Sequence, residues 1–191
     1  MVVLEQEMKI PVPTLTPIRQ RLAEAGARRL HPQLHEGNWV LDDPSHTLAA
    51  AGRLLRVRRA GDTAALTVKE PGTFAGGIKS RVELETAVGS AEQALAILAA
   101  LGFVPVRRYE KRREGWSLGG VTVALDETPM GAFVELEGES PLLEPAAVEL
   151  GLDPRAAVRG TYLDLWAAFR AAHPGAPEDM VFASEPAVRP I

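Results

Sequence analysis

The stretch KSRVELET, residues 79–86, alternates charged and apolar side chains without interruption. Successive side chains of a β-strand point to opposite faces of its sheet, so this alternation predicts a strand with two chemically different faces. One face carries only charged side chains, namely Lys79, Arg81, Glu83 and Glu85. Val82 and Leu84 lie on the other face, which we expect to pack against helices.

Other stretches repeat this arrangement of charges. LEQEMKI (4–10) and VELEG (134–138) each place two glutamates on one face of a predicted strand. LLRVRR (54–59), LTVKEP (66–71) and YEKRRE (109–114) place bases on one face in the same way. The charged positions outside KSRVELET are Glu5, Glu7, Lys9, Arg56, Arg58, Lys69, Lys111, Arg113, Glu135 and Glu137, with Asp126 at the end of another strand.

Two interpretations of these charged faces are open. Half-exposed antiparallel strands commonly alternate in this way, and their polar faces are then solvated. Ordinary outer faces, however, mix Thr, Ser, Gln and Lys, whereas these carry almost only Glu, Arg and Lys. Closing such a sheet into a barrel would instead direct the charged faces into a common lumen. Desolvated charges must be paired, and here bases and acids alternate around the predicted lumen.

The remaining pattern predicts an α+β fold, a closed antiparallel eight-stranded β-barrel with flanking helices. Strands are expected at 3–12, 35–41, 53–60, 63–70, 79–88, 103–114, 115–118, 120–126 and 132–139, and helices at 14–25, 90–101, 154–158 and 161–172. Hairpin-length separators favour antiparallel pairing. A chain of 191 residues suits one domain, which we expect at 1–172. Residues 173–191 hold four prolines and are expected to form an irregular tail.

Composition narrows the classes of function. The net charge of −4 predicts neither a nucleic-acid nor a membrane partner. The chain has no cysteine, which excludes disulfides, thiolate metal sites and cysteine nucleophiles. No membrane span or signal peptide is evident, so we expect a cytoplasmic monomer or homodimer. The four histidines show no metal-ligand spacing and are expected at the surface.

The charged set indicates a polyanionic ligand and a hard cation. Oxygen-only ligands suit Mg²⁺ or Mn²⁺, which typically bind one or two carboxylates together with water and substrate phosphates. Arginine forks and lysine point charges suit phosphate oxygens. We therefore expect a small phosphate compound as substrate and Mg²⁺ or Mn²⁺ as cofactor.

The residues resemble the CYTH superfamily, the triphosphate tunnel metalloenzymes, which include class IV adenylyl cyclases, thiamine triphosphatases and inorganic triphosphatases. Its ExExK signature is similar to Glu5, Glu7 and Lys9. LRVR, LTVKEP, KSRVELE, YEKRRE and LDETPMGAFVELEG follow in the family's order, and TYLDL (161–165) is similar to its closing helix motif. The resemblance therefore covers about 165 residues, from residue 4 onwards.

The resemblance implies a role for each matching position. Glu5, Glu7 and Lys9 would form the catalytic group, and the metal would be bound by Glu5, Glu7, Asp126, Glu135 and Glu137. The phosphate-binding bases would be Lys9, Arg56, Arg58, Lys69, Arg81, Lys111 and Arg113, with Glu83 and Glu85 in support. In LHEGNWVLDDP the aromatic residue is Trp39 where many members have tyrosine, so a mechanism using a tyrosine hydroxyl is not expected there.

The implied reaction is metal-dependent hydrolysis of a triphosphate, whether inorganic tripolyphosphate, thiamine triphosphate or a nucleoside triphosphate. The alternative is a class IV adenylate cyclase that converts ATP to cyclic AMP and pyrophosphate. Both reactions use the same clamp of bases on the phosphates, and they differ in which phosphorus the nucleophile attacks. The sequence leaves this choice open.

Overall fold

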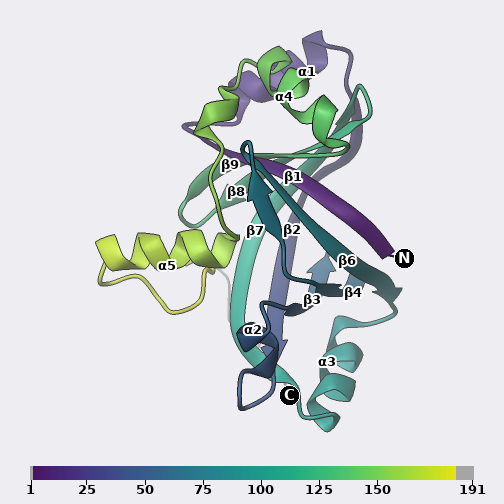
Figure 1. Ribbon diagram of the computed structural model, residues 1–191, viewed down its shortest axis with the longest axis vertical. Helices are drawn as coiled ribbons and strands as arrows, with labels where there is room; N and C mark the ends of the chain where they lie inside the picture. The colour runs from purple at the N-terminus through teal and green to yellow at the C-terminus, as the bar shows by residue number, and fades with distance from the viewer. Residues whose placement is uncertain (1, 184–191) are drawn as a thin grey trace.

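The computed structural model describes residues 2–183, which form one antiparallel sheet closed into a barrel (Figure 1). The barrel order is β1-β9-β8-β7-β2-β3-β4-β6, and pairing of β6 with β1 closes it. The strands are β1 (Val2–Val12), β2 (Arg28–Asp42), β3 (Leu54–Ala60), β4 (Thr63–Lys69), β6 (Ile78–Val88), β7 (Val104–Leu118), β8 (Val121–Thr128) and β9 (Gly131–Glu137), with the short β5 (Thr73–Ala75) beside β6. The predicted closed eight-stranded barrel and its α+β class are confirmed.

The helices lie outside the barrel and cover parts of its apolar outer face. They are α1 (Thr16–Glu24), α2 (Thr47–Ala50), α3 (Ala91–Ala100), α4 (Ser140–Glu149) and α5 (Tyr162–Ala172), with the 3₁₀ turn η1 at Pro154–Ala156. Figure 1 shows α1 and α4 together at one end of the molecule and α3 near the other. Among residues 2–183, no helix is long and apolar enough to cross a membrane.

The hydrophobic core lies between this outer face and the helices. Under α1 and α4, Met8 of β1 packs with Leu22 and Leu143, which are both completely buried. Under α3, Trp39 of β2 packs with Val57 of β3. The barrel wall is thus apolar outside, which is why the alternating strands direct their charged side chains inward.

Several elements differ from the sequence-based expectation. α2 and β5 were not predicted, and the helix expected at 154–158 is the 3₁₀ turn η1. β2 begins at Arg28 rather than at residue 35, with register irregularities around Pro32, which has no N–H to donate to a neighbouring strand. β7 continues through Gly115, where the expected strands were separated. α4 was not predicted because Pro145 lies inside it, but burial of Leu143 and its neighbours against the barrel stabilises it.

The expectation that every apolar strand face packs against a helix is wrong for one part of the wall. Val2 and Leu4 of β1 lie opposite Leu84 and Val82 of β6. These four side chains are 38–68% exposed. Here the apolar alternation reflects the strand period without burial of the outer face.

The segment after α5 follows the edge of β7. The Met180 amide donates to the Arg108 carbonyl at 3.1 Å, and the Glu110 amide donates to the Met180 carbonyl at 2.8 Å. The Met180 side chain is completely buried in a cluster with Tyr109 and Trp166. The domain boundary at residue 172 stays a prediction, and residues 184–191 of the predicted tail lie outside the described residues.

Candidate active site in the charged lumen

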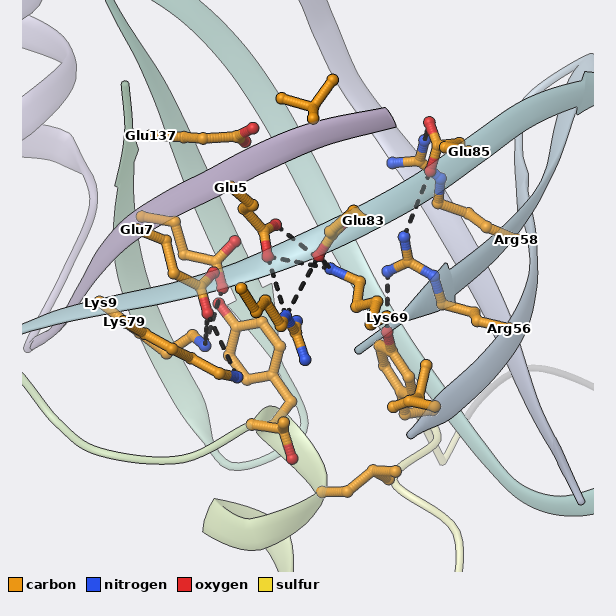
Figure 2. Close-up of a pocket in the computed structure, with 18 of the residues that line it drawn as sticks. Glu5, Glu7, Lys9, Arg56, Arg58, Lys69, Lys79, Glu83, Glu85 and Glu137 are labelled. Atoms are coloured by element: carbon orange, nitrogen blue, oxygen red, sulfur yellow. Dashed lines mark hydrogen bonds and ion pairs between the residues drawn. The ribbon is translucent and has the colours of Figure 1, made fainter. Parts of the chain in front are cut away.

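A cavity of about 420 Å³ occupies the barrel lumen (Figure 2). Its wall contains every base assigned to phosphate binding from the sequence, namely Lys9, Arg56, Arg58, Lys69, Arg81, Lys111 and Arg113. It also contains the predicted acids Glu5, Glu7, Glu83, Glu85, Glu135 and Glu137. The charged strand faces therefore meet in one enclosed space, and the interpretation that they are solvated outer faces is wrong.

The pairing of β1 with β6 arranges the first part of this wall. Glu5 lies opposite Arg81, and Glu7 lies opposite Lys79. Residues opposite each other in an antiparallel pair have neighbouring side chains on the same face. The register of this strand pair therefore places an acid beside a base at both levels.

Glu5 and Glu83 form a carboxyl pair braced by bases. Glu5 accepts from Lys69 Nζ at 3.2 Å and from Arg81 Nε at 3.0 Å. Burial and the hydrogen bond with Glu5 raise the pKa of Glu83 to about 7. Burial opposes ionisation of Glu5, but its bond with Glu83 and the charges of Lys69 and Arg81 hold its pKa well below the usual range. The pair therefore tends to hold one proton on Glu83 near neutral pH.

Asp126 joins the opposite side of the wall and is completely buried. Arg113 donates to its two oxygens at 2.7 and 2.6 Å, and Lys111 Nζ donates at 3.2 Å. The Tyr162 hydroxyl also donates to Asp126, at 2.6 Å. These contacts commit Asp126 to orienting the two bases, and it does not line the cavity. Its assignment as a metal ligand stays a prediction.

Glu135 lies within reach of three bases. Lys9 Nζ is 3.0 Å away, Arg113 is in close contact, and Lys111 Nζ is 3.9 Å away. Burial opposes ionisation of Glu135, but the charges of Arg113 and Lys9 lower its pKa well below the usual range. Lys9 also lies over the Tyr162 ring at 4.5 Å from its centroid. The result is a fixed cationic surface facing the cavity.

Arg56 and Arg58 extend from β3 into the cavity (Figure 2). Arg58 donates to Glu85 at 3.1 Å. Arg56 donates to the Tyr109 hydroxyl at 3.2 Å and to the Thr67 hydroxyl at 3.3 Å. These contacts fix the positions of both guanidinium groups, whose planar fork suits two-point binding of phosphate oxygens.

Glu7 lies at the centre of a row of three charges on adjacent strands, with Lys79 of β6 on one side and Glu137 of β9 on the other. Lys79 Nζ is 3.6 Å from Glu7 Oε1. Within residues 2–183, Glu137 has no hydrogen-bonded or ion-paired partner. Burial and the nearby carboxylates of Glu5 and Glu135 raise its pKa. Glu7 and Glu137 are therefore the acids of the lumen with the weakest compensation.

Sequence reasoning missed Glu36, which is 3% exposed beneath the lumen surface. Its oxygens lie 3.6 Å from Lys111 Nζ and 3.8 Å from Arg58 Nη1. Burial opposes its ionisation, but Lys111 and Arg113 lower its pKa to about 2. The signal was present in the alternation of LHEGNWV, because Glu36 faces the lumen only if Trp39 faces outward, as it does beneath α3.

A second chamber of about 200 Å³ adjoins the main cavity and shares with it Glu7, Arg58, Arg113, Glu135 and Glu137. His31, expected at the surface, is partly buried and lies in the wall of this chamber. A Cβ atom on Gly115 would lie 2.4 Å from His31 Nε2, so glycine at this position makes room for the imidazole. The lumen therefore continues past the acidic row.

The fit of a divalent cation rests on Glu7 and Glu137. Within residues 2–183, three acidic or imidazole groups nowhere converge closely enough to enclose a metal ion by themselves. Mg²⁺ commonly takes only one or two carboxylates and completes its shell with water and substrate phosphates. Glu137, unpaired and beside Glu7, satisfies that more modest requirement.

Comparison with known proteins identifies a family and a fold that this chain shares. The sequence model described as the CYTH domain matches residues 4–146. A solved structure from Pyrococcus horikoshii is 26% identical, with a TM-score of 0.71 over 87% of this chain and 99% of its own. A candidate adenylate cyclase from Vibrio parahaemolyticus is 19% identical, with a TM-score of 0.76 over 86% of this chain and 98% of its own.

A third structure has the same fold. It is a candidate adenylyl cyclase from Hippeastrum, described as having a dominant triphosphatase activity. It is 17% identical, with a TM-score of 0.63 over 88% of this chain and 96% of its own. No curated protein matches the chain.

Proposed function

The chain belongs to the CYTH domain family, and on this premise we propose that it is a metal-dependent enzyme that hydrolyses a triphosphate held in its lumen. The observation that supports this most strongly is the convergence of bases and acids from six of the barrel strands, β1, β3, β4, β6, β7 and β9, on one cavity of about 420 Å³. Removing these charges from water is costly, and a protein that used them only for solubility would leave them on its outer surface. A polyanion entering the lumen recovers that cost.

The bases bind and orient the phosphate chain. Arg56 and Arg58 donate through guanidinium forks, while Lys9 and Lys69 act as point charges. Each is held by a neighbouring carboxylate or hydroxyl, so little reorganisation is needed when substrate binds. In phosphoryl transfer, catalysis comes mainly from positioning and from neutralising charge on the transferred group. This arrangement supplies both.

A divalent cation would be held by Glu7 and Glu137. When bound, it would neutralise negative charge on the phosphate oxygens and favour in-line attack by water. Glu5 is not needed as a ligand in this proposal, because its oxygens are already committed to Lys69 and Arg81. Glu135 is similarly committed to Lys9. Both acids then position the bases that contact substrate.

Hydrolysis is favoured over cyclisation by what the wall lacks. Among the described residues, the aromatic rings that line the cavity are Tyr109 and Tyr162, and both are at most 7% exposed. Their hydroxyls are engaged with Arg56 and Asp126. Neither ring offers an open face on which a purine could stack. Recognition of the substrate therefore rests on its phosphate chain. Binding of the phosphates is sufficient for hydrolysis, whereas cyclisation also requires that the ribose hydroxyl be oriented.

One incubation series tests the proposal. Tripolyphosphate, thiamine triphosphate and ATP are each supplied with Mg²⁺, with Mn²⁺ or with excess EDTA, and orthophosphate, pyrophosphate and cyclic AMP are measured separately. We expect orthophosphate release that stops in EDTA and returns when metal is added. Cyclic AMP and pyrophosphate from ATP would replace hydrolysis by cyclisation, and full turnover in EDTA would refute the metal requirement.

A further inference from the structure

Lys79 differs from the other bases in the lumen. Every base assigned to phosphate binding from the sequence donates a hydrogen bond or ion pair to a carboxylate at 3.2 Å or less, except Arg56, which donates to two hydroxyls. Lys79 Nζ is buried and has no hydrogen-bond partner within residues 2–183. Its nearest carboxylate oxygen, on Glu7, is 3.6 Å away. Lys79 therefore carries a charge that the protein does not satisfy by itself.

The surroundings of Lys79 make this shortage costly. Glu7 is shared, because Lys9 Nζ also lies 3.9 Å from the same oxygen. Burial and the charge of Arg81 lower the pKa of Lys79. A buried ammonium group whose one carboxylate is distant and shared is poorly compensated, and an oxygen of a bound phosphate would supply the acceptor that it lacks.

The position of Lys79 shows which ligand it would meet. It lines the main cavity and lies at one end of the row Lys79–Glu7–Glu137, next to Glu7 and one strand further from Glu137 (Figure 2). An anion bound beside Lys79 gains a full charge-assisted contact, whereas an anion bound beside an already paired base must compete with that base's carboxylate. A phosphate oxygen at this point would thus gain the most from the lumen.

We propose that Lys79 is a further substrate-binding residue, which holds the phosphate group lying next to Glu7 and Glu137. The inference rests on the proposed function, since it assigns one contact within the same site. Lys79 differs from Lys111, which already donates a hydrogen bond to Asp126 in the protein without ligand. The charge of Lys79 stabilises the protein with phosphate bound and destabilises the protein without ligand.

This gives Lys79 an unusual pair of predicted properties. Lys79→Gln removes an uncompensated charge, so the empty protein should melt at the same temperature as the wild type or higher. The same change should raise the Kd for tripolyphosphate about ten- to hundredfold, as expected for loss of one charge-assisted hydrogen bond. Lys79→Arg keeps the charge and should retain most of the affinity. A purely structural lysine would lose stability and affinity together.

The test measures melting temperature and tripolyphosphate affinity in EDTA, where the ligand is not consumed, for wild type, Lys79→Gln, Lys79→Arg and the outward-facing control Arg59→Gln. Loss of affinity in Lys79→Gln alone, without loss of stability, supports the inference. Unchanged affinity in Lys79→Gln overturns it while wild-type turnover leaves the proposed function standing. A lower melting temperature of Lys79→Gln also overturns it. If the wild type neither binds nor hydrolyses tripolyphosphate, thiamine triphosphate or ATP, the proposed function fails, and the inference fails with it.

Discussion

Replacing Glu83 by glutamine should make the protein more stable, and the gain should grow with pH. Glu83 has its pKa raised from 4.5 to about 7 by burial and by its hydrogen bond with Glu5. A carboxyl group with a raised pKa in the folded state holds its proton there more firmly than in the unfolded chain. Its contribution to stability is therefore complete below pH 4.5 and is lost as the pH rises towards 7.

The size of the effect follows from the shift. A difference of about 2.5 pKa units at about 1.36 kcal/mol each sets an upper limit of about 3 kcal/mol. Part of this loss has already occurred at pH 5, so about 2 kcal/mol should separate pH 5 from pH 8. For a chain of this size that corresponds to a difference of roughly 4–8 °C in melting temperature. Glutamine keeps the shape of the neutral carboxyl group and does not titrate.

The assay is thermal unfolding of wild type and Glu83→Gln at pH 5 and pH 8 in EDTA, with the exposed Glu149→Gln as control. The melting temperature of Glu83→Gln should exceed that of the wild type by several degrees more at pH 8 than at pH 5, whereas Glu149→Gln should follow the wild type at both. A Glu83→Gln protein that is less stable than wild type at pH 8 would refute the carboxyl pair. It would show that Glu83 acts as a fully ionised partner of Lys69.

Three further predictions concern the lumen bases, two lumen acids and the segment after α5. Arg56→Ala and Arg58→Ala should each lower kcat/KM for the hydrolysed triphosphate about ten- to hundredfold through loss of a charge-assisted phosphate contact. Arg59 donates to Glu92 outside the barrel, so Arg59→Ala should change kcat/KM little. Equal effects in all three variants would contradict the lumen assignment. Glu135→Gln and Glu137→Gln should both reduce turnover, but only Glu135→Gln should lower the free energy of unfolding, by about 3–5 kcal/mol, since it breaks a buried ion pair with Lys9; equal melting temperatures would count against the described pairing. Met180→Ala should cost about 2–5 kcal/mol in urea unfolding because its side chain is fully buried; a loss below about 1 kcal/mol would mean that the segment after α5 is dispensable for folding.

The alternation of charged and apolar residues predicted much of the site. Because strand side chains alternate with a period of two, KSRVELET and its relatives identify which residues share a face, and the order of motifs indicates the family. The closed barrel and the cavity-lining positions of the predicted bases follow from that local rule together with the need to bury the apolar faces. Where the rule was not applied, in LHEGNWV, Glu36 was missed.

Pairing across the lumen could not be predicted from the sequence, because it depends on register and on strands far apart in the chain. Glu5 and Glu137 occur in similar motifs, yet Glu5 is bonded to Lys69 and Arg81 while Glu137 has no such partner among the described residues. Asp126, expected to bind metal, accepts from Arg113, Lys111 and Tyr162, which lie 13, 15 and 36 residues away in the chain. Only the folded barrel decides which charges cancel.

The sequence by itself determined which residues face the lumen, because that depends on the local alternation of each strand. The tertiary structure alone decided how those residues divide the work. Lys69 and Lys79 both line the cavity, but closure of β6 onto β1 gives Lys69 the carboxylate of Glu5 and leaves Lys79 with a shared, more distant one. The electrostatic interaction of two charges depends on their separation in space and on their burial. Neither quantity can be deduced from the spacing of residues along one strand.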